Sequence, residues 1–132
     1  MTQEQKDLLL KDLCARLPYG VKLGFYASAT KQTYICTLLG LEPQEDEPVI
    51  AKTENGSFYM LAGNVKPYLF PLSSMTEEQR KELIKLINTG QNDNNEFMRC
   101  RCRIEFYHIN HFDYRGLIPM GLAIDATGLN IY

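Results

Sequence analysis

Two short polar connections in the first half of the chain constrain its fold more than any other feature. Residues 27–32 and the Asn55-Gly56 dipeptide each separate runs that are rich in β-branched and aromatic residues. Connections this short join antiparallel neighbours, and Asn and Gly accept the positive φ angles of a two-residue turn, which would pair Thr53 with Phe58. We therefore predict an antiparallel four-stranded meander, open or curled toward a small barrel. The predicted strands are about 21–26, 33–39, 48–53 and 58–62.

Helical periodicity flanks this β region on both sides. Leucines recur at spacings of three and four over residues 3–17, and a capping-box pair, Thr2 and Gln5, precedes them. The same pairing, Thr with Gln three positions later, precedes an apolar stripe over 77–89. Together these elements predict an α+β fold with an N-terminal helix and two or three C-terminal helices, in a single domain spanning 1–132.

Prolines interrupt the chain between the predicted meander and the second helix. Pro67 and Pro71 lack the backbone N–H that a central strand donates. We therefore expect Tyr68 and its neighbours to form an extended apolar bridge over the core, and not a regular strand. After the second helix, residues 90–96 are polar and have no apolar anchor, which predicts a flexible linker.

The segment over residues 99–116 contains two cysteines, both histidines and four of the arginines of the chain. Its periodicity fits two structures. A period of two places the cysteines on one face and the arginines on the other, as in a half-buried strand. Helical spacing fits better from Ile104 onward. Beyond this segment, Pro119 suits the first turn of a short helical turn over 117–120, followed by extended chain.

Four residues of this segment are candidate zinc ligands or catalytic groups. Cys100, Cys102, His108 and His111 are of the types that zinc takes, and with Asp113 they include a nucleophile and a base. The Cys-x-Cys spacing is tighter than in common zinc sites, and the chain has no phosphate-binding loop, nucleophile elbow or His-Glu-x-x-His pattern. We therefore expect no metal, no cofactor and no enzymatic activity, and keep a zinc-binding or enzymatic protein as the third hypothesis.

A nucleic-acid contact is the alternative use of the same segment. Arg99, Arg101 and Arg103 lie near Phe106 and Tyr107, and such side chains combine phosphate contacts with base stacking. Three arginines make a small footprint, however, and the net charge of -2 gives no general attraction to phosphates. A solvated face explains the arginines better, so weak nucleic-acid binding is the second hypothesis.

The composition is that of an ordinary globular domain, with 45% hydrophobic and 23% charged residues. The first residues lack the basic start and apolar run of a secretory signal, and no apolar run reaches the ~20 residues of a membrane helix. The four cysteines are scattered, which favours free thiols in a reducing compartment. We therefore predict a cytoplasmic protein that does not bind membranes.

Three blocks of the chain, LPYGVK, KPYLFPLSSMT and HFDYRGLIPMGLAIDATG, resemble a family of short uncharacterised proteins of gut anaerobic bacteria and of their phages and mobile elements. The resemblance implies a helix over about 101–110, running into the HFDYRG phrase. It implies no activity and no catalytic residue, because the family has none assigned.

These considerations lead to one leading functional hypothesis. We expect a non-enzymatic protein-binding or adaptor module of phage or mobile-element origin, whose protein partner contacts the sheet edge or the bridge around Tyr68. His111, Asp113, Tyr114 and Arg115 are candidates for a partner surface or for a structural junction. In a junction, Asp113 would cap the turn that follows it, and Arg115 would pair with Asp113 or with a carbonyl.

Overall fold

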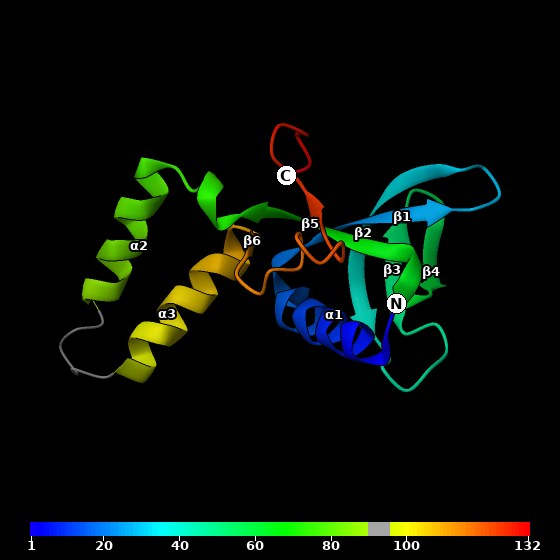
Figure 1. Ribbon diagram of the computed structural model, residues 1–132, viewed down its shortest axis with the longest axis horizontal. Helices are drawn as coiled ribbons and strands as arrows, with labels where there is room; N and C mark the ends of the chain where they lie inside the picture. The colour runs from blue at the N-terminus through cyan, green and yellow to red at the C-terminus, as the bar shows by residue number, and fades with distance from the viewer. Residues whose placement is uncertain (90–95) are drawn as a thin grey trace.

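The computed structural model describes residues 1–89 and 96–132 and has the predicted α+β fold (Figure 1). An N-terminal helix, α1 (Gln3–Arg16), packs on one face of a sheet. Two further helices, α2 (Glu77–Thr89) and α3 (Glu96–Ile109), lie side by side and extend away from the sheet. The strands are β1 (Lys22–Ala27), β2 (Gln32–Leu41), β3 (Val49–Thr53), β4 (Gly56–Met60), β5 (Val65–Pro71), β6 (Phe112–Asp113) and β7 (Ile124–Asp125).

The N-terminal helix has the predicted bounds to within one residue. The Thr2 hydroxyl accepts a hydrogen bond from the Gln5 N–H at 3.1 Å, and the Gln5 side chain accepts one from the Thr2 N–H at 3.0 Å. This reciprocal pair is the predicted capping box. Leu9 and Leu13, one turn apart, are fully buried and join the main core. The helix is therefore fixed at its start by local bonds and along its length by packing.

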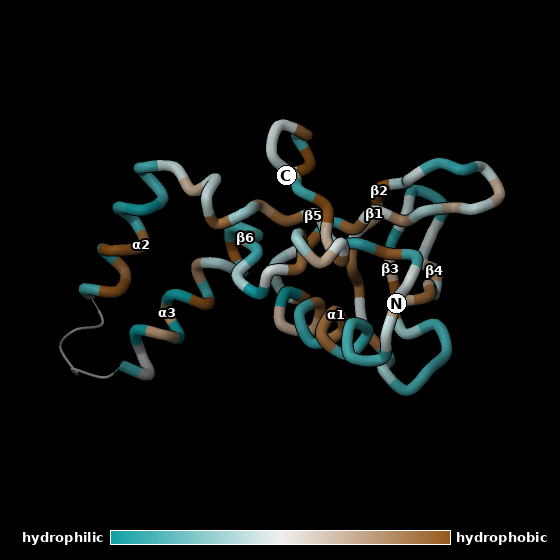
Figure 2. The backbone as a smooth tube through the Cα atoms, in the orientation of Figure 1, coloured by the Kyte–Doolittle hydropathy of each residue, from teal (hydrophilic) through white to brown (hydrophobic). Residues whose placement is uncertain are grey.

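The sheet is open, with strand order β4-β3-β2-β1-β5-β6, and β7 also pairs with β5. Its first four strands form the predicted antiparallel meander through two hairpins. Because the strands of the described chain do not close, the barrel alternative is wrong. The main core lies between the meander and α1, where Figure 2 shows hydrophobic positions on both elements. Its fully buried members are Leu9, Leu13, Val21, Leu23, Val49, Ala51, Val65, Leu69 and Leu117.

The predicted bridge is a strand of the sheet, contrary to expectation. β5 pairs antiparallel with β1 and parallel with β6 and β7. The Phe70 N–H donates to a carbonyl just before β6 at 2.8 Å, and N–H groups of successive strand residues point to opposite sides. Pro67 and Pro71 therefore fall on the side away from that bond. There the Ala126 N–H donates to the Leu69 carbonyl, a bond that requires no proline N–H.

The second hairpin turns one residue earlier than predicted. Thr53 pairs with Gly56, so Glu54 and Asn55 form the turn and β4 begins before residue 58. The prediction assigned positive φ angles to both Asn55 and Gly56. In the structure Gly56 supplies the positive angle, with φ 120°. The Thr53 hydroxyl accepts from the Asn55 N–H and donates to the Gly56 carbonyl, both at 3.2 Å. The partner of Thr53 in β4 is thus two residues earlier than predicted. Because side chains alternate between the two faces of a strand, a shift of two residues leaves Phe58 on the predicted face.

The segment of alternating arginine and cysteine is helical. α3 begins at Glu96, before the helix predicted over 101–110, and its first turn carries this acidic residue at the positive end of the helix dipole. The predicted linker, 90–96, lies outside the described residues except for Glu96. The predicted helical turn over 117–120 is a hydrogen-bonded turn that ends at Gly121 and does not continue as a helix.

A second, smaller core joins α2 and α3 to the sheet. Leu83 from α2, Phe106 from α3 and Phe112 from β6 are buried together. The predicted capping box opens α2, because the Thr76 hydroxyl accepts from the Gln79 N–H at 3.1 Å and the Gln79 side chain accepts from the Thr76 N–H at 2.9 Å. The two helices contact the rest of the molecule mainly through β6 and α1 (Figure 1).

Candidate functional site

A buried network of charged side chains connects α1 to the C-terminal part of the chain. Asp12 and Arg16 are both 0% exposed, and the Arg16 Nε donates to the Asp12 Oδ2 at 2.8 Å. The Arg16 Nη2 donates to the Phe112 carbonyl at 2.6 Å. The Arg115 Nε donates to the Asp12 Oδ1 at 3.1 Å. One carboxylate thus holds two guanidinium groups that are far apart in the sequence.

Tyr114 lies between these arginines and a histidine. The guanidinium carbons of Arg16 and Arg115 are 5.4 and 5.0 Å from the centre of the Tyr114 ring, which is within cation–π range. The Tyr114 hydroxyl and the His108 Nε2 are 2.7 Å apart. Burial, assisted by Arg16, lowers the pKa of His108. The imidazole is therefore neutral at pH 7 and bonded to a neighbour.

Tyr132 fastens the C-terminal part of the chain to the sheet. Its ring stacks on that of His111, with 3.7 Å between centroids and 10° between planes. Its hydroxyl donates to the Tyr68 carbonyl at 2.7 Å and accepts from the Lys22 N–H at 3.0 Å. Burial, and to a smaller extent Arg16, lowers the pKa of His111 to about 4.

Asp113 caps the turn that follows β6. Its two carboxylate oxygens accept from the Leu117 N–H and the Ile118 N–H, each at 2.9 Å. This is the capping role predicted for Asp113. The prediction for Arg115 was wrong, because it named Asp113 or a carbonyl as the partner and the observed partner is Asp12. The pairing was out of reach of local sequence reasoning because Asp12 and Arg115 are 103 positions apart.

The residues predicted as a partner surface or junction therefore come together in one place. His111 and Asp113 are buried, Tyr114 and Arg115 are half-buried, and Tyr68 is 6% exposed within the sheet. Their hydrogen bonds run to the backbone and to the side chains of Asp12, His108 and Tyr132. Of the three buried side-chain nitrogens that have no partner in the described part of the chain, two belong to this region, the Arg16 Nη1 and the His111 Nδ1. This inward bonding favours the junction over an exposed surface.

The three candidate arginines for nucleic acid do not share one helix face. Successive residues of a helix are about 100° apart, so Arg99 and Arg103, four positions apart, lie on the same side, whereas Arg101 points about 200° away from Arg99. Arg101 is exposed and pairs with Glu105 at 3.2 Å. Arg103 is exposed and Arg99 is half-buried. The positive charge of α3 is therefore spread and partly neutralised.

The candidate zinc ligands are also dispersed. Cys100 is exposed and Cys102 is half-buried on α3, whereas His108 is buried against Tyr114 and His111 is stacked on Tyr132. Over residues 1–89 and 96–132, no group of three or more His, Cys, Asp or Glu side chains is arranged to hold a metal ion.

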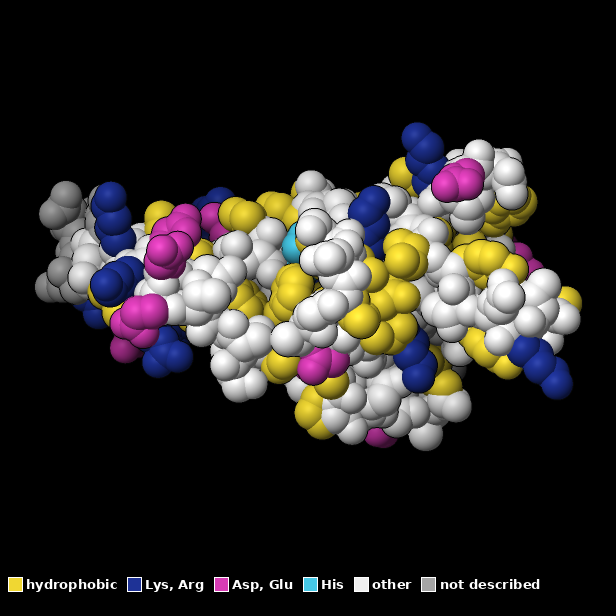
Figure 3. Space-filling view, turned by 90° about the horizontal axis from the view of Figure 1, so that it is seen from above, with side chains coloured by type: hydrophobic (Ala, Val, Ile, Leu, Met, Phe, Trp, Pro, Cys, Tyr) yellow, Lys and Arg dark blue, Asp and Glu magenta, His cyan; other side chains and the backbone are white. Residues whose placement is uncertain are grey.

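A large hollow lies at the ends of the two hairpins, and sequence reasoning did not locate it. We call it the hairpin groove; its volume is about 790 Å³. Tyr34 and Phe58, on its walls, are 44% and 46% exposed. Figure 3 shows hydrophobic side chains gathered at this end of the molecule. The lining residues are Phe25, Thr33, Tyr34, Ile35, Thr53, Glu54, Asn55, Phe58, Tyr59 and Met60.

The groove is open because α1 covers only part of the sheet face. Along one face of β2, Cys36 and Leu38 are 3% exposed, but Tyr34 on the same face is 44% exposed. The apolar face therefore continues beyond the helix that buries it.

The strand beside the groove is the edge of the sheet. In the described chain β4 pairs with β3 alone, and alternate residues of an edge strand direct their N–H and C=O groups outward. The sequence of β4, GSFYM, contains no charged residue and no proline, which are the usual protections of a sheet edge. Phe58 and Tyr59, 46% and 54% exposed, lie on its opposite faces.

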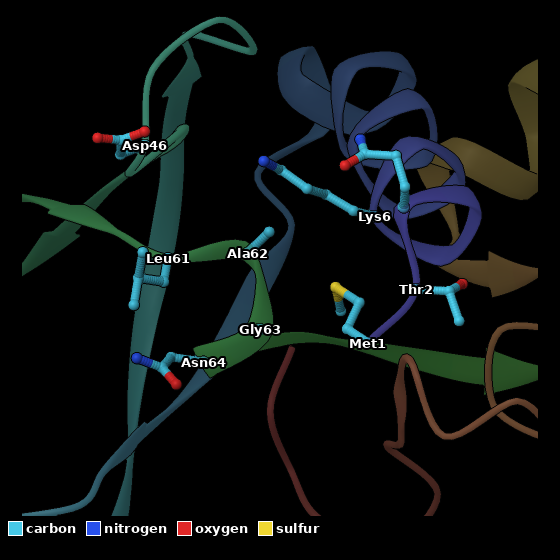
Figure 4. A pocket seen from close by; sticks show the side chains of 9 residues that line it. Met1, Thr2, Lys6, Asp46, Leu61, Ala62, Gly63 and Asn64 are labelled. Carbon is cyan, nitrogen blue, oxygen red and sulfur yellow. The ribbon is translucent and has the colours of Figure 1, made fainter.

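Acidic residues flank both ends of β4. Glu54 precedes the strand in the turn. At the other end, Asp46 lines a pocket of about 320 Å³ together with Leu61, next to the end of β4, and with Lys6 of α1 (Figure 4). Asp46 belongs to the loop between β2 and β3, which Figure 2 shows as hydrophilic and which we call the acidic loop. Its carboxylates are those of Glu42, Glu45, Asp46 and Glu47.

The acidic loop contacts the edge strand directly. The Tyr59 hydroxyl of β4 donates to the Glu42 Oε1 at 3.5 Å. The acidic groups around β4 are Glu54 and the four of the loop, and the basic ones are Lys52 on β3 and Lys6 on α1. The surroundings of the exposed edge are therefore negative on balance.

In the part of the chain that the structure describes, no helix is long and apolar enough to cross a membrane. Comparisons of the chain with models of known protein families, with curated proteins and with solved structures found no match.

Proposed function

We propose that this chain is a non-enzymatic protein-binding module and that the hairpin groove and the adjoining edge of β4 form its docking site. The observation that carries this proposal is the exposure of Tyr34 and Phe58, 44% and 46%, on the walls of an apolar hollow. Contiguous exposed apolar surface in soluble proteins marks interaction sites. Tyrosine in particular is enriched among the residues that dominate binding energy at protein interfaces.

The chemistry of the groove supports recognition over catalysis. Its side chains are aromatic, aliphatic, hydroxyl or amide groups, and its one carboxylate, that of Glu54, has no His, Cys or Lys among the other lining residues. Such a lining supplies apolar contact with a few polar groups to orient a partner. From the resemblance of the three sequence blocks, we also propose a cytoplasmic role in bacteria that carry a phage or mobile element.

The test is a selection of peptides from a displayed random library on the immobilised chain, followed by affinity measurement of the enriched peptides. We expect the Tyr34→Ser/Phe58→Ser variant to bind them at least about tenfold more weakly, which corresponds to about 1.4 kcal/mol. Both side chains are half exposed, so the fold should persist and circular dichroism can check it.

The matched control is Ile109→Ser, because Ile109 is 57% exposed on α3, outside the groove. It should bind the selected peptides as the unaltered chain does. Failure to enrich any peptide, or equal binding by the groove variant, would overturn the proposal. So would an oligonucleotide that binds through Arg99, Arg101 and Arg103 while no peptide binds.

A further inference from the structure

We infer that the occupant of this docking site is an extended peptide segment of a partner protein, apolar in its middle and basic at both ends, which adds to the sheet as a strand beside β4. The inference rests on the proposed function above and specifies its partner. Three properties of β4 support it: its free backbone groups, its exposed aromatic side chains and the charges at its two ends.

The backbone of β4 is available for pairing. Within the described residues the strand has one neighbour, β3, so half of its N–H and C=O groups have no strand opposite them. Natural proteins protect such edges with charges, prolines or bulges, and β4 has none of these between Gly56 and Met60. An added strand satisfies these groups, which is the mode of peptide binding called β-augmentation.

The side chains of β4 define what the middle of the added strand must be. A neighbouring strand lies about 4.8 Å away, so its side chains pack alternately beside those of the edge strand. On the groove face they meet Phe58, and on the other face they meet Tyr59. Both faces of the added strand therefore contact aromatic rings, which favours β-branched or aromatic residues throughout its middle.

The charges decide between a foreign peptide and a second copy of this chain. Two β4 strands paired antiparallel would place Glu54 of one copy beside the acidic loop of the other. Paired parallel, they would place one acidic loop beside the other. Like charges meet in both arrangements, which opposes self-association. A peptide with lysine or arginine at both ends meets Glu54 at one end and the acidic loop, which includes Asp46, at the other.

The experiment uses three short synthetic peptides with the same middle of alternating valine and threonine. The first has two lysines at each end, the second has two glutamates at each end, and the third is the first with every backbone amide of its middle N-methylated. We expect the lysine-ended peptide to bind at least about tenfold more tightly than the glutamate-ended one at low salt, and this ratio to fall as salt screens the charges. N-methylation should abolish binding because it removes the donors that pair with β4.

Hydrogen exchange of the chain provides the structural readout. In the complex, the outward amides between Gly56 and Met60 should gain protection, while the amides of α2 should not change. The Glu45→Gln/Glu47→Gln variant should lose part of the preference for the lysine-ended peptide, and the matched control on α2, Glu78→Gln/Glu82→Gln, should keep it. All four glutamates are exposed.

The outcomes separate this inference from the proposed function. If library peptides bind the groove but β4 amides gain no protection, or if the glutamate-ended peptide binds as well as the lysine-ended one, the inference is wrong and the docking site stands. If no peptide of any kind distinguishes the groove variant from the unaltered chain, both are wrong. Concentration-dependent dimerisation with protection of β4 would instead assign the edge to a second copy.

Discussion

Replacing Asp12 by alanine should destabilise this protein more than removing any exposed carboxylate. The carboxylate is 0% exposed and faces Arg16, also 0% exposed, and Arg115, whose side chain is 21% exposed. Without Asp12, the Arg115 guanidinium can turn toward water, but that of Arg16 stays buried without its counter-charge. Removing one partner of a buried ion pair costs about 3–5 kcal/mol. We therefore expect Asp12→Ala to lose that much unfolding free energy.

Urea unfolding followed by circular dichroism measures this loss. With a denaturant slope of about 1.5 kcal/mol per molar urea, a loss of 3–5 kcal/mol moves the unfolding midpoint down by roughly 2–3 M. The control is Glu105→Ala, which removes the exposed partner of Arg101 and should cost less than about 1 kcal/mol. The Asp12→Leu/Arg16→Met variant tests the cause, because it removes both charges together.

The double variant should recover most of the loss, since apolar replacements of a buried pair are often neutral or stabilising. It should still fall short by about 1–3 kcal/mol because the Phe112 carbonyl loses the Arg16 donor at 2.6 Å. Two results would refute this reasoning. One is an unfolding free energy of Asp12→Ala within about 1 kcal/mol of that of the unaltered chain, and the other is a double variant no more stable than the single one. Either would show that Asp12 does not stabilise the protein by compensating the buried charge of Arg16.

Two further predictions concern His111 and Gly24. The pKa of His111 is lowered from 6.5 to about 4, so between these pH values the unfolded chain binds a proton that the folded chain does not. The unfolding free energy should therefore be highest above pH 6.5 and fall by up to about 3 kcal/mol toward pH 4. His111→Asn, which tolerates the φ of 60°, should flatten this dependence in urea titrations at several pH values, and an unchanged slope would contradict the assignment. A methyl group on Gly24 would lie 2.8 Å from the Ile124 Cδ1 and 3.1 Å from the Tyr68 hydroxyl, so Gly24→Ala should cost about 1–3 kcal/mol in the same assay. Gly63→Ala, where nothing lies within 4 Å, is its control, and equal stability of the two variants would argue against close packing at Gly24.

Local patterns in the sequence were sufficient for the elements whose determinants are neighbours in the chain. The capping pairs at Thr2 and Thr76 were predicted and observed because both bonds of a capping box lie within four residues. The meander was predicted because its connections are short. The turn at Asn55 was misplaced by one residue because the Thr53 hydroxyl, a side chain outside the predicted turn, stabilises the turn that forms.

Elements that depend on distant residues were predicted poorly. Nothing local to Pro67 indicates that β5 pairs with β1 and β7 in spite of its missing N–H. Nor does the alternation of arginine and cysteine reveal a helix. The same residues fit both a period of two and helical spacing, and only the surface that they pack against decides between the two. The same limit applies to the docking site. Alternation along β2 identifies the face of Tyr34, but where α1 packs on the sheet determines that this part of the face stays uncovered.

The Asp12 carboxylate also has a consequence for the order in which this chain folds. Its two arginines lie 4 and 103 positions away, so the first helix is synthesised early but can complete its ion pairs only when the segment around Arg115 is available. Contacts of such sequence separation slow folding because the intervening loop must close first. During synthesis the charged side of the N-terminal helix therefore stays exposed to water until Arg115, which is made 103 residues later, can reach Asp12.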